Sequence, residues 1–300
     1  MKELFSEKES DFSREVKILK KLSRATHAHA HLITLLATYE QGGKYHLVFP
    51  WAEADLLEYW KKINPRPPQT RKMVTWLDEQ CRGVADGLST IHRYETLSGR
   101  SLLHRNSLPP DTPKEPGTGT TEMDVNETTV IRLFGRHGDI KPSNILWFPD
   151  RKTNDGYGTL KITDFGIAHF STKDGVSARE RDLVANSPTY RAPECDFPEW
   201  MLSPSSDVWT LGCVYLEFIA WFFGGHTRLE EFVERRKAVD PYWHYFRTDT
   251  FFTIEKDKPK VKDSVIEVSC NSADMVGLLK SILTPLAIGH QRASFTRCLH

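Results

Sequence analysis

The sequence lacks the cysteine pattern, the net charge and the long apolar run that mark three large classes of protein. Its five cysteines are at least 18 residues apart and form no C-x-x-C pair, so neither a disulfide framework nor a zinc knuckle is predicted. Its 40 Lys and Arg balance 40 Asp and Glu, which argues against a dedicated nucleic-acid or anionic-membrane binder. The most apolar stretch, Val208–Phe223, has 16 residues including Glu217, fewer than the roughly 20 needed to cross a bilayer. We therefore expect a core helix there, no membrane span and no nucleic-acid partner.

The first twenty residues also lack the apolar segment of a signal peptide, which predicts a cytoplasmic or nuclear location. What the chain does have is 300 residues of which 39% are hydrophobic and 11% aromatic. A chain of this length and composition can bury a sizeable core in one large or two modest domains. The sequence does not indicate an oligomeric state.

An amphipathic helix is predicted close to the start of the chain. Phe12, Val16, Leu19 and Leu22 recur at the spacing of one helix face, and Glu15 lies within that apolar stripe. A carboxylate in this position needs a cationic partner if it is buried. The alternative is a Glu at the solvent edge of the helix.

The patterning after this helix changes from sheet to helix. Residues 31–39 and 45–49 are predicted to form a strand hairpin, and residues 55–63 and 70–94 are predicted to be helical. Residues 95–133 are rich in Pro, Gly and Thr, which predicts a long, flexible insert. The charge run at residues 230–237 is predicted to be a solvated helix face.

A polar loop downstream of the insert leads into two short apolar runs. The runs 145–148 and 160–163 are separated by a turn rich in Asp, Asn and Gly, so we expect them to pair as an antiparallel hairpin. This pairing would bring Asn144 and Asp164 side by side, with Asp139 nearby. Two oxygen ligands of this kind suit Mg²⁺ bound together with a nucleotide.

The same loop contains groups suited to phosphoryl transfer. Asp139 can accept a proton from an incoming hydroxyl, and Lys141 can offset charge on the transferred phosphoryl group. The chemistry predicted from these residues is therefore positioning and electrostatic stabilisation.

Three ordered motifs carry a family resemblance. His137-Gly138-Asp139, followed by Asn144, resembles the H-R-D-(x4)-N catalytic loop; Asp164-Phe165-Gly166 resembles the D-F-G triplet; and Ala192-Pro193-Glu194 resembles the A-P-E triplet. On these residues the chain is similar to eukaryotic protein kinases, and Lys141 with Ser187 points to the serine/threonine type.

The resemblance implies an α+β, two-lobed kinase-like fold. Residues 1–51 would be a truncated small β lobe, and residues 52–300 a large, mainly α-helical lobe containing the insert. ATP and Mg²⁺ would be the cofactors, and serine or threonine residues of proteins the substrates.

The resemblance also assigns roles to individual positions. Beside Asp139, Lys141, Asn144 and Asp164, the implied residues are Lys2 and Glu15 at the nucleotide phosphates, Phe49, Pro50 and Ala52 at the adenine, and Ser187 in the substrate segment. Asp207 would brace the catalytic loop, and Arg292 would pair with Glu194.

The sequence departs from the family pattern at two places. It contains no G-x-G-x-x-G before the first helix, and only Met1 precedes Lys2, so we expect no strand to hold that lysine. A solvated terminal lysine and a truncated copy of a longer kinase are then the natural interpretations. Gly138 replaces the usual arginine, which predicts that phosphorylation within residues 164–194 does not gate activity through that side chain. The alternative function is a catalytically impaired kinase-like module that acts by binding proteins.

Overall fold

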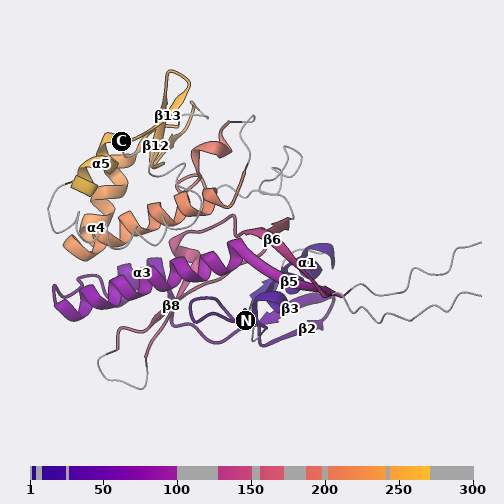
Figure 1. The fold of residues 1–300 in the computed structure, drawn as a ribbon. Coiled ribbons are helices and arrows are strands. Elements are labelled where there is room, and N and C mark those ends of the chain that lie inside the picture. The colour runs from indigo at the N-terminus through magenta and orange to yellow at the C-terminus, as the bar shows by residue number, and fades with distance from the viewer. Residues whose placement is uncertain are drawn as a thin grey trace, which may run out of the picture.

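The structure is a computed structural model, and it combines a small sheet-containing part with a larger helical part (Figure 1). It describes residues 2–4, 9–24, 27–99, 128–150, 156–171, 187–197, 202–240 and 244–270.

The small part is a three-stranded antiparallel sheet with one helix. Strands β1 (Lys2–Leu4), β2 (Ala37–Gln41) and β3 (Lys44–Val48) pair in the order β1-β3-β2, and helix α1 spans Glu9–Leu22. The ring of Phe12 on α1 stacks on Tyr45 of β3 with 4.3 Å between centroids, which packs the helix onto the sheet.

The expectation that no strand holds Lys2 was wrong. Lys2 lies opposite Leu47 in the β1–β3 ladder, so its backbone is part of the sheet. A strand of three residues is too short to show an alternating pattern, and its partner β3 is distant in sequence, so only the folded chain reveals it.

The first strand of the predicted hairpin begins at Ala37 and not at residue 31. The preceding residues pair elsewhere, because Ile33 N–H donates to the carbonyl of Ile162 at 2.9 Å and Ile162 N–H donates to that of His31 at 2.8 Å. The apolar run is therefore divided between two sheets, a division that hydrophobic patterning cannot reveal.

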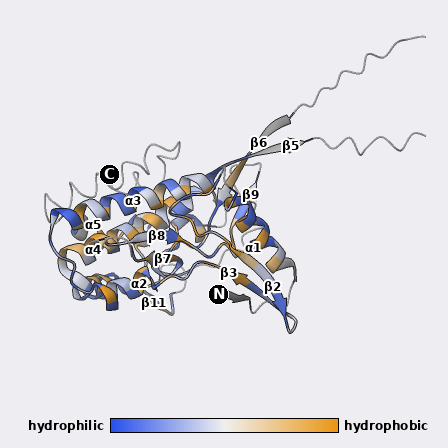
Figure 2. Cartoon of the chain, turned by 90° about the horizontal axis from the view of Figure 1, so that it is seen from below, coloured by the Kyte–Doolittle hydropathy of each residue, from blue (hydrophilic) through white to orange (hydrophobic). Residues whose placement is uncertain are grey.

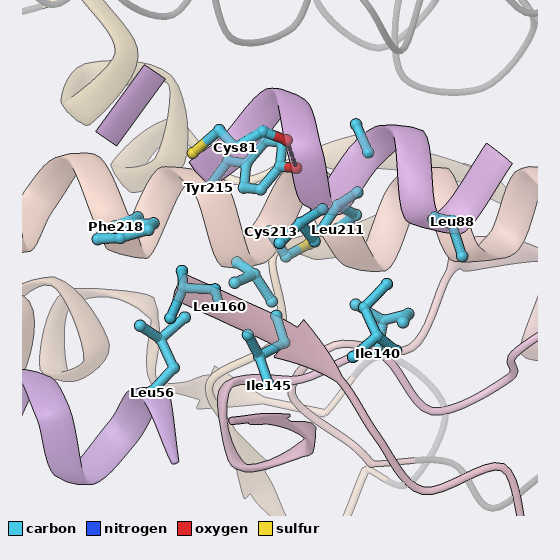
Figure 3. Close-up of a cluster of buried hydrophobic side chains, with 14 of the residues drawn as sticks. Leu56, Cys81, Leu88, Ile140, Ile145, Leu160, Leu211, Cys213, Tyr215 and Phe218 are labelled. Carbon is cyan, nitrogen blue, oxygen red and sulfur yellow. Dashed lines mark hydrogen bonds between the residues drawn. The ribbon is translucent and has the colours of Figure 1, made fainter. Parts of the chain in front are cut away.

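The helical part is built on two long helices that lie side by side, α3 (Arg71–His92) and α4 (Ser205–Arg236) (Figure 1). Thr70 caps α3 by accepting a hydrogen bond from Met73 N–H. Between the two helices, the Tyr215 hydroxyl donates to the carbonyl of Cys81 within the buried apolar cluster (Figure 3). By length and composition α4 could cross a membrane, yet 83% of its most apolar window is buried inside the protein. The apolar run therefore forms a core helix, as predicted.

Short elements complete the helical part. They are β4 (Ala54–Asp55), α2 (Leu56–Glu58) with a π-helical turn at Tyr59–Ile63, 3₁₀ turns at Pro142–Asn144 and Pro193–Cys195, β10 (Ala238–Val239), β11 (Arg247–Thr248), β12 (Phe252–Glu255), β13 (Lys258–Val261) and α5 (Asp263–Cys270).

The predicted insert has ordered ends. Strands β5 (Arg93–Gly99) and β6 (Thr128–Arg136) pair along their length as an antiparallel ribbon that projects away from the helices (Figure 2). Strand β9 (His169–Ser171) pairs with the C-terminal end of β6. The flexible loop predicted over residues 95–133 is thus strand at both ends, and residues 100–127 lie outside the described part of the chain.

Candidate active site

A hairpin places two of the predicted metal ligands together. Strands β7 (Ile145–Phe148) and β8 (Thr159–Ile162) pair antiparallel with Ile145 opposite Ile162, which confirms the predicted pairing. One step beyond the ladder, Thr163 N–H donates to the carbonyl of Asn144 at 3.0 Å. Asn144 and Asp164 therefore leave the hairpin at the same end.

Asp139 lies in a closed set of contacts with two other predicted site residues. Lys141 Nζ is 2.7 Å from Asp139 Oδ2 and donates to Ser187 Oγ at 3.1 Å. Ser187 Oγ donates to Asp139 Oδ1 at 2.9 Å, across 48 residues of sequence. The Asp139 side chain keeps 12% of its surface exposed. A carboxylate, an ammonium and a hydroxyl thus meet at the edge of solvent.

Asn144 is oriented by Asp139. Its Nδ2 donates to the Asp139 carbonyl at 2.8 Å and to Oδ2 at 2.9 Å, which leaves its amide oxygen as the acceptor end. Asp164 has a positive φ of 65°, a conformation that carries strain and is concentrated at functional sites.

These donors fit a magnesium ion bound together with nucleotide phosphates. Within the part of the chain that the structure describes, no three His, Cys, Asp or Glu side chains form a metal cage. Mg²⁺ does not need one, since it is typically held by one or two carboxylates together with waters and substrate phosphates. Asn144 and Asp164 are the residues that would hold it.

A buried carboxylate supports the loop that carries Asp139. Asp207, 1% exposed, accepts hydrogen bonds from the backbone N–H of His137 at 2.7 Å and of Gly138 at 2.8 Å, and its Oδ2 is 3.0 Å from His92 Nε2. Burial alone would raise the pKa of Asp207, but the hydrogen bond and charge of His92, with the charge of His137, lower it overall. Asp207 is therefore an anion that holds two consecutive loop amides.

Helix α1 lies against the segment that follows Asp164. Glu15 is 2% exposed, and a Cβ placed on Gly166 would lie 3.7 Å from its Oε2. Arg14 Nη2 donates to the Gly166 carbonyl at 2.9 Å. Between these residues and the catalytic loop, fully buried Phe165 meets the His137 ring edge-on at 5.1 Å. The burial predicted for Glu15 is observed.

The predicted adenine-binding residues link the two parts of the molecule. Phe49, Pro50 and Ala52 are half-buried between β3 and β4, and Trp51 is 80% exposed. Among the described residues, no backbone–backbone hydrogen bond involves residues 50–52. These backbone groups are therefore not used in a backbone ladder between β3 and β4.

Two predicted roles depend on groups outside the described part. The Lys2 side chain and the whole of Arg292 fall there, so the Lys2–Glu15 and Arg292–Glu194 pairs stay predictions. Glu194 is buried, its pKa is raised by that burial and secondarily by Asp207, and no cation among the described residues pairs with it.

Comparison with known proteins decides the family. Residues 134–300, more than half of the chain, match the family model described as protein kinase domain. The chain belongs to the eukaryotic protein kinase family. This confirms the resemblance to serine/threonine protein kinases and the α+β fold class predicted from the motifs.

Curated relatives of this kinase come from animals and plants. It is 26% identical to cyclin-dependent kinase-like 4 of Mus musculus over 206 residues, which are 69% of this chain and 43% of that protein. It is 25% identical to cyclin-dependent kinase 8 of Drosophila melanogaster over 245 residues, 80% of this chain and 43% of the relative. Mitogen-activated protein kinase kinase kinase 20 of Arabidopsis thaliana is 34% identical over 150 residues, 46% and 40% of the two chains. The chain spans about two fifths of the length of these relatives.

Sequence reasoning missed a buried ionic network that contacts Tyr190. Arg236, predicted to lie on a solvated face, is fully buried and donates to Glu217 at 2.6 Å. Glu217 also accepts a hydrogen bond from the hydroxyl of Tyr190 at 2.8 Å. Tyr190 lies three residues after Ser187 in the sequence. The Arg236 guanidinium lies 4.1 Å and 4.0 Å from the ring centroids of Phe232 and Phe251. The signal that could have revealed the network was Glu217, a carboxylate inside the most apolar stretch of the chain.

Proposed function

We propose that this kinase transfers the γ-phosphoryl group of ATP, with Mg²⁺, to serine or threonine hydroxyls of protein substrates. The observation that carries the proposal is the contact set of Asp139, Lys141 and Ser187, at 2.7, 3.1 and 2.9 Å. The Asp139 side chain is 12% exposed, so a substrate hydroxyl that approached it beside Ser187 would be next to both a carboxylate and an ammonium.

Each residue has a defined task in this proposal. Asp139 orients the incoming hydroxyl and accepts its proton, while Lys141 balances negative charge on the transferred group. Asn144 and Asp164 hold Mg²⁺, which supplies charge neutralisation at the phosphates. The backbone of residues 50–52, which makes no backbone–backbone hydrogen bond to described residues, binds adenine.

The Lys2–Glu15 pair is proposed to grip the phosphates. The position of Lys2 on β1 and the burial of Glu15 beside Gly166 support this arrangement. Because the Lys2 backbone is part of the β1–β3 ladder, its side chain would be held more firmly than that of a free terminal lysine.

The second candidate is a kinase-like module that binds a protein partner without transferring phosphate, because membership of the kinase family does not by itself establish transfer.

Phosphate transfer from radiolabelled ATP to a generic basic protein separates the two functions. With Mg²⁺, Asp139→Asn and Asp164→Ala should each reduce transfer by about 100-fold or more, because they remove the base and a metal ligand. Asp263→Asn, which changes a carboxylate that is 79% exposed, is the matched control and should transfer like the unaltered chain. Transfer that survives in Asp139→Asn would refute the role of Asp139 as the base, and no transfer by the unaltered chain would refute catalysis.

A further inference from the structure

An aromatic cluster joins α1 to the insert ribbon. Tyr94, the second residue of β5, is 1% exposed. Its ring stacks on His27 with 4.4 Å between centroids and meets Phe170 edge-on at 5.2 Å. Lys21 Nζ lies 5.5 Å from the Tyr94 centroid and 5.6 Å from that of Phe170. We call these four residues the Tyr94 cluster.

The cluster brings together segments that are distant in sequence. Lys21 belongs to the last turn of α1, the helix that carries Glu15. His27 follows that helix, and its Nε2 is 2.9 Å from the carbonyl oxygen of Glu95 on β5. Phe170 belongs to β9, which follows the Asp164-Phe165-Gly166 triplet and pairs with β6. One ring thus contacts the helix end, the ribbon and the strand after the proposed metal ligand.

The contacts are of a kind that favours one arrangement of these segments. An ammonium over aromatic rings and two ring–ring contacts are all lost if α1 moves away from the ribbon. Burial, together with the nearby charges of Lys17 and Arg24, lowers the pKa of Lys21. The C-terminal end of α1 thus carries several positive charges close together, and the faces of the two rings stabilise one of them. Nearer the start of α1, Arg14 donates a hydrogen bond to the Gly166 carbonyl at 2.9 Å.

We propose that Tyr94 is a positioning residue: through its ring, the β5–β6 ribbon holds the C-terminal end of α1 against β9 and so keeps Glu15 beside Gly166. For catalysis the inference rests on the proposed function, since Glu15 matters there as a partner of the phosphate-gripping lysine. The ring performs this role, because the Tyr94 hydroxyl has no hydrogen bond to another described residue. The β5–β6 ribbon is then a structural support of helix α1.

Hydrogen exchange on the full chain tests the inference without requiring activity. Tyr94→Ala should accelerate exchange of the Glu15–Leu22 amides by about tenfold or more while exchange in the centre of α4 stays unchanged. Tyr94→Phe keeps the ring and should behave like the unaltered chain. Tyr245→Ala, which truncates a tyrosine that is 98% exposed, is the matched control and should have no effect on α1.

The outcomes distinguish this inference from the proposed function. If α1 exchanges at the same rate in Tyr94→Ala, or if Tyr94→Phe behaves like Tyr94→Ala, positioning by the ring is refuted. If Tyr94→Ala also accelerates exchange in α4, His27→Ala replaces it as the test, because it truncates a half-buried side chain and leaves the core intact. Unchanged exchange of the α1 amides in His27→Ala would then refute positioning by the ring. A chain that never transfers phosphate but shows the α1 response would refute catalysis and retain the positioning role. In a catalytic chain, Tyr94→Ala should lower transfer and Tyr94→Phe should retain it.

Discussion

Ser187 connects the proposed base to the segment proposed to receive substrate. Its hydroxyl accepts from Lys141 and donates to Asp139, so one side chain fixes the position of both charged groups. Hydrogen bonds to charged partners are worth more than neutral ones, and they preserve a geometry that transfer requires.

We expect Ser187→Ala to lower kcat by about ten- to a hundredfold, since two hydrogen bonds to charged groups are lost. KM for ATP should change little, because Ser187 lies on the substrate side of Asp139. Ser187→Thr keeps the hydroxyl and should retain most of the rate. Steady-state kinetics of the two variants test this, and a Ser187→Ala enzyme with unchanged kcat would show that the contact set does not position the base.

The proximity of residues can be predicted from sequence where their spacing is dictated by local structure. Asp139, Lys141 and Asn144 share one loop, and the hairpin that follows brings Asp164 to them, so pattern and strand pairing were sufficient. Arg236 was missed because it ends a charged helical run, and only the tertiary fold places it between two phenylalanines. A buried charge is specified by its partner, and Glu217 lies 19 residues earlier.

At the scale of elements, α4 consists of two helical segments joined at Gly225. This glycine has φ 70° and ψ −167°, a region that side chains other than glycine rarely adopt. The kink lets His226 N–H donate to the Pro65 carbonyl at 2.8 Å. A Cβ on Gly225 would lie 2.5 Å from that same carbonyl oxygen.

Gly225→Ala should therefore lower the free energy of unfolding by about 2 to 5 kcal/mol, from backbone strain and overlap with rigid backbone. Thr227→Ala, at an exposed position two residues later in the same helix, is the control. Alanine favours helix more than threonine does, so stability should be equal or slightly higher. Urea denaturation of both variants decides the point: a Gly225→Ala loss no larger than that of Thr227→Ala would mean that the kink does not require glycine.

Long helices and the β7–β8 hairpin were predictable because each has a strong period and clear turn residues. Strand β1 and the ribbon ends were not, because short strands are stabilised by partners that are remote in sequence. The division of residues 31–39 between two sheets has the same cause.

At the scale of the whole molecule, a lysine near the C-terminal end of the described chain bears on overall stability. Lys262 is 9% exposed, and its Nζ donates to the Arg236 carbonyl at 2.6 Å. Burial, and next the charge of Arg236, lower the pKa of Lys262 to about 8 from its usual 10.5, although Asp249 and Asp240 act in the opposite direction. The charged form of Lys262 therefore lowers the free energy of unfolding relative to the neutral form.

The sign of the resulting pH dependence follows from proton counting. Below about pH 8 both the folded and the unfolded state bind the Lys262 proton, so the full cost of the buried ammonium is present. Between about pH 8 and 10.5 the unfolded chain still binds this proton and the folded chain does not. In that range Lys262 therefore makes the free energy of unfolding rise with pH.

Lys262→Met removes the titrating group. Its stability relative to the unaltered chain should therefore be most favourable at pH 7 and decline toward pH 10, as measured by urea denaturation at both values. Lys258→Met, at an exposed position on β13, should show no such trend. If the difference in free energy of unfolding between Lys262→Met and the unaltered chain stays constant from pH 7 to pH 10, Lys262 keeps an ordinary pKa in the folded protein. Its ammonium would then be satisfied by the Arg236 carbonyl and the neighbouring carboxylates despite its burial.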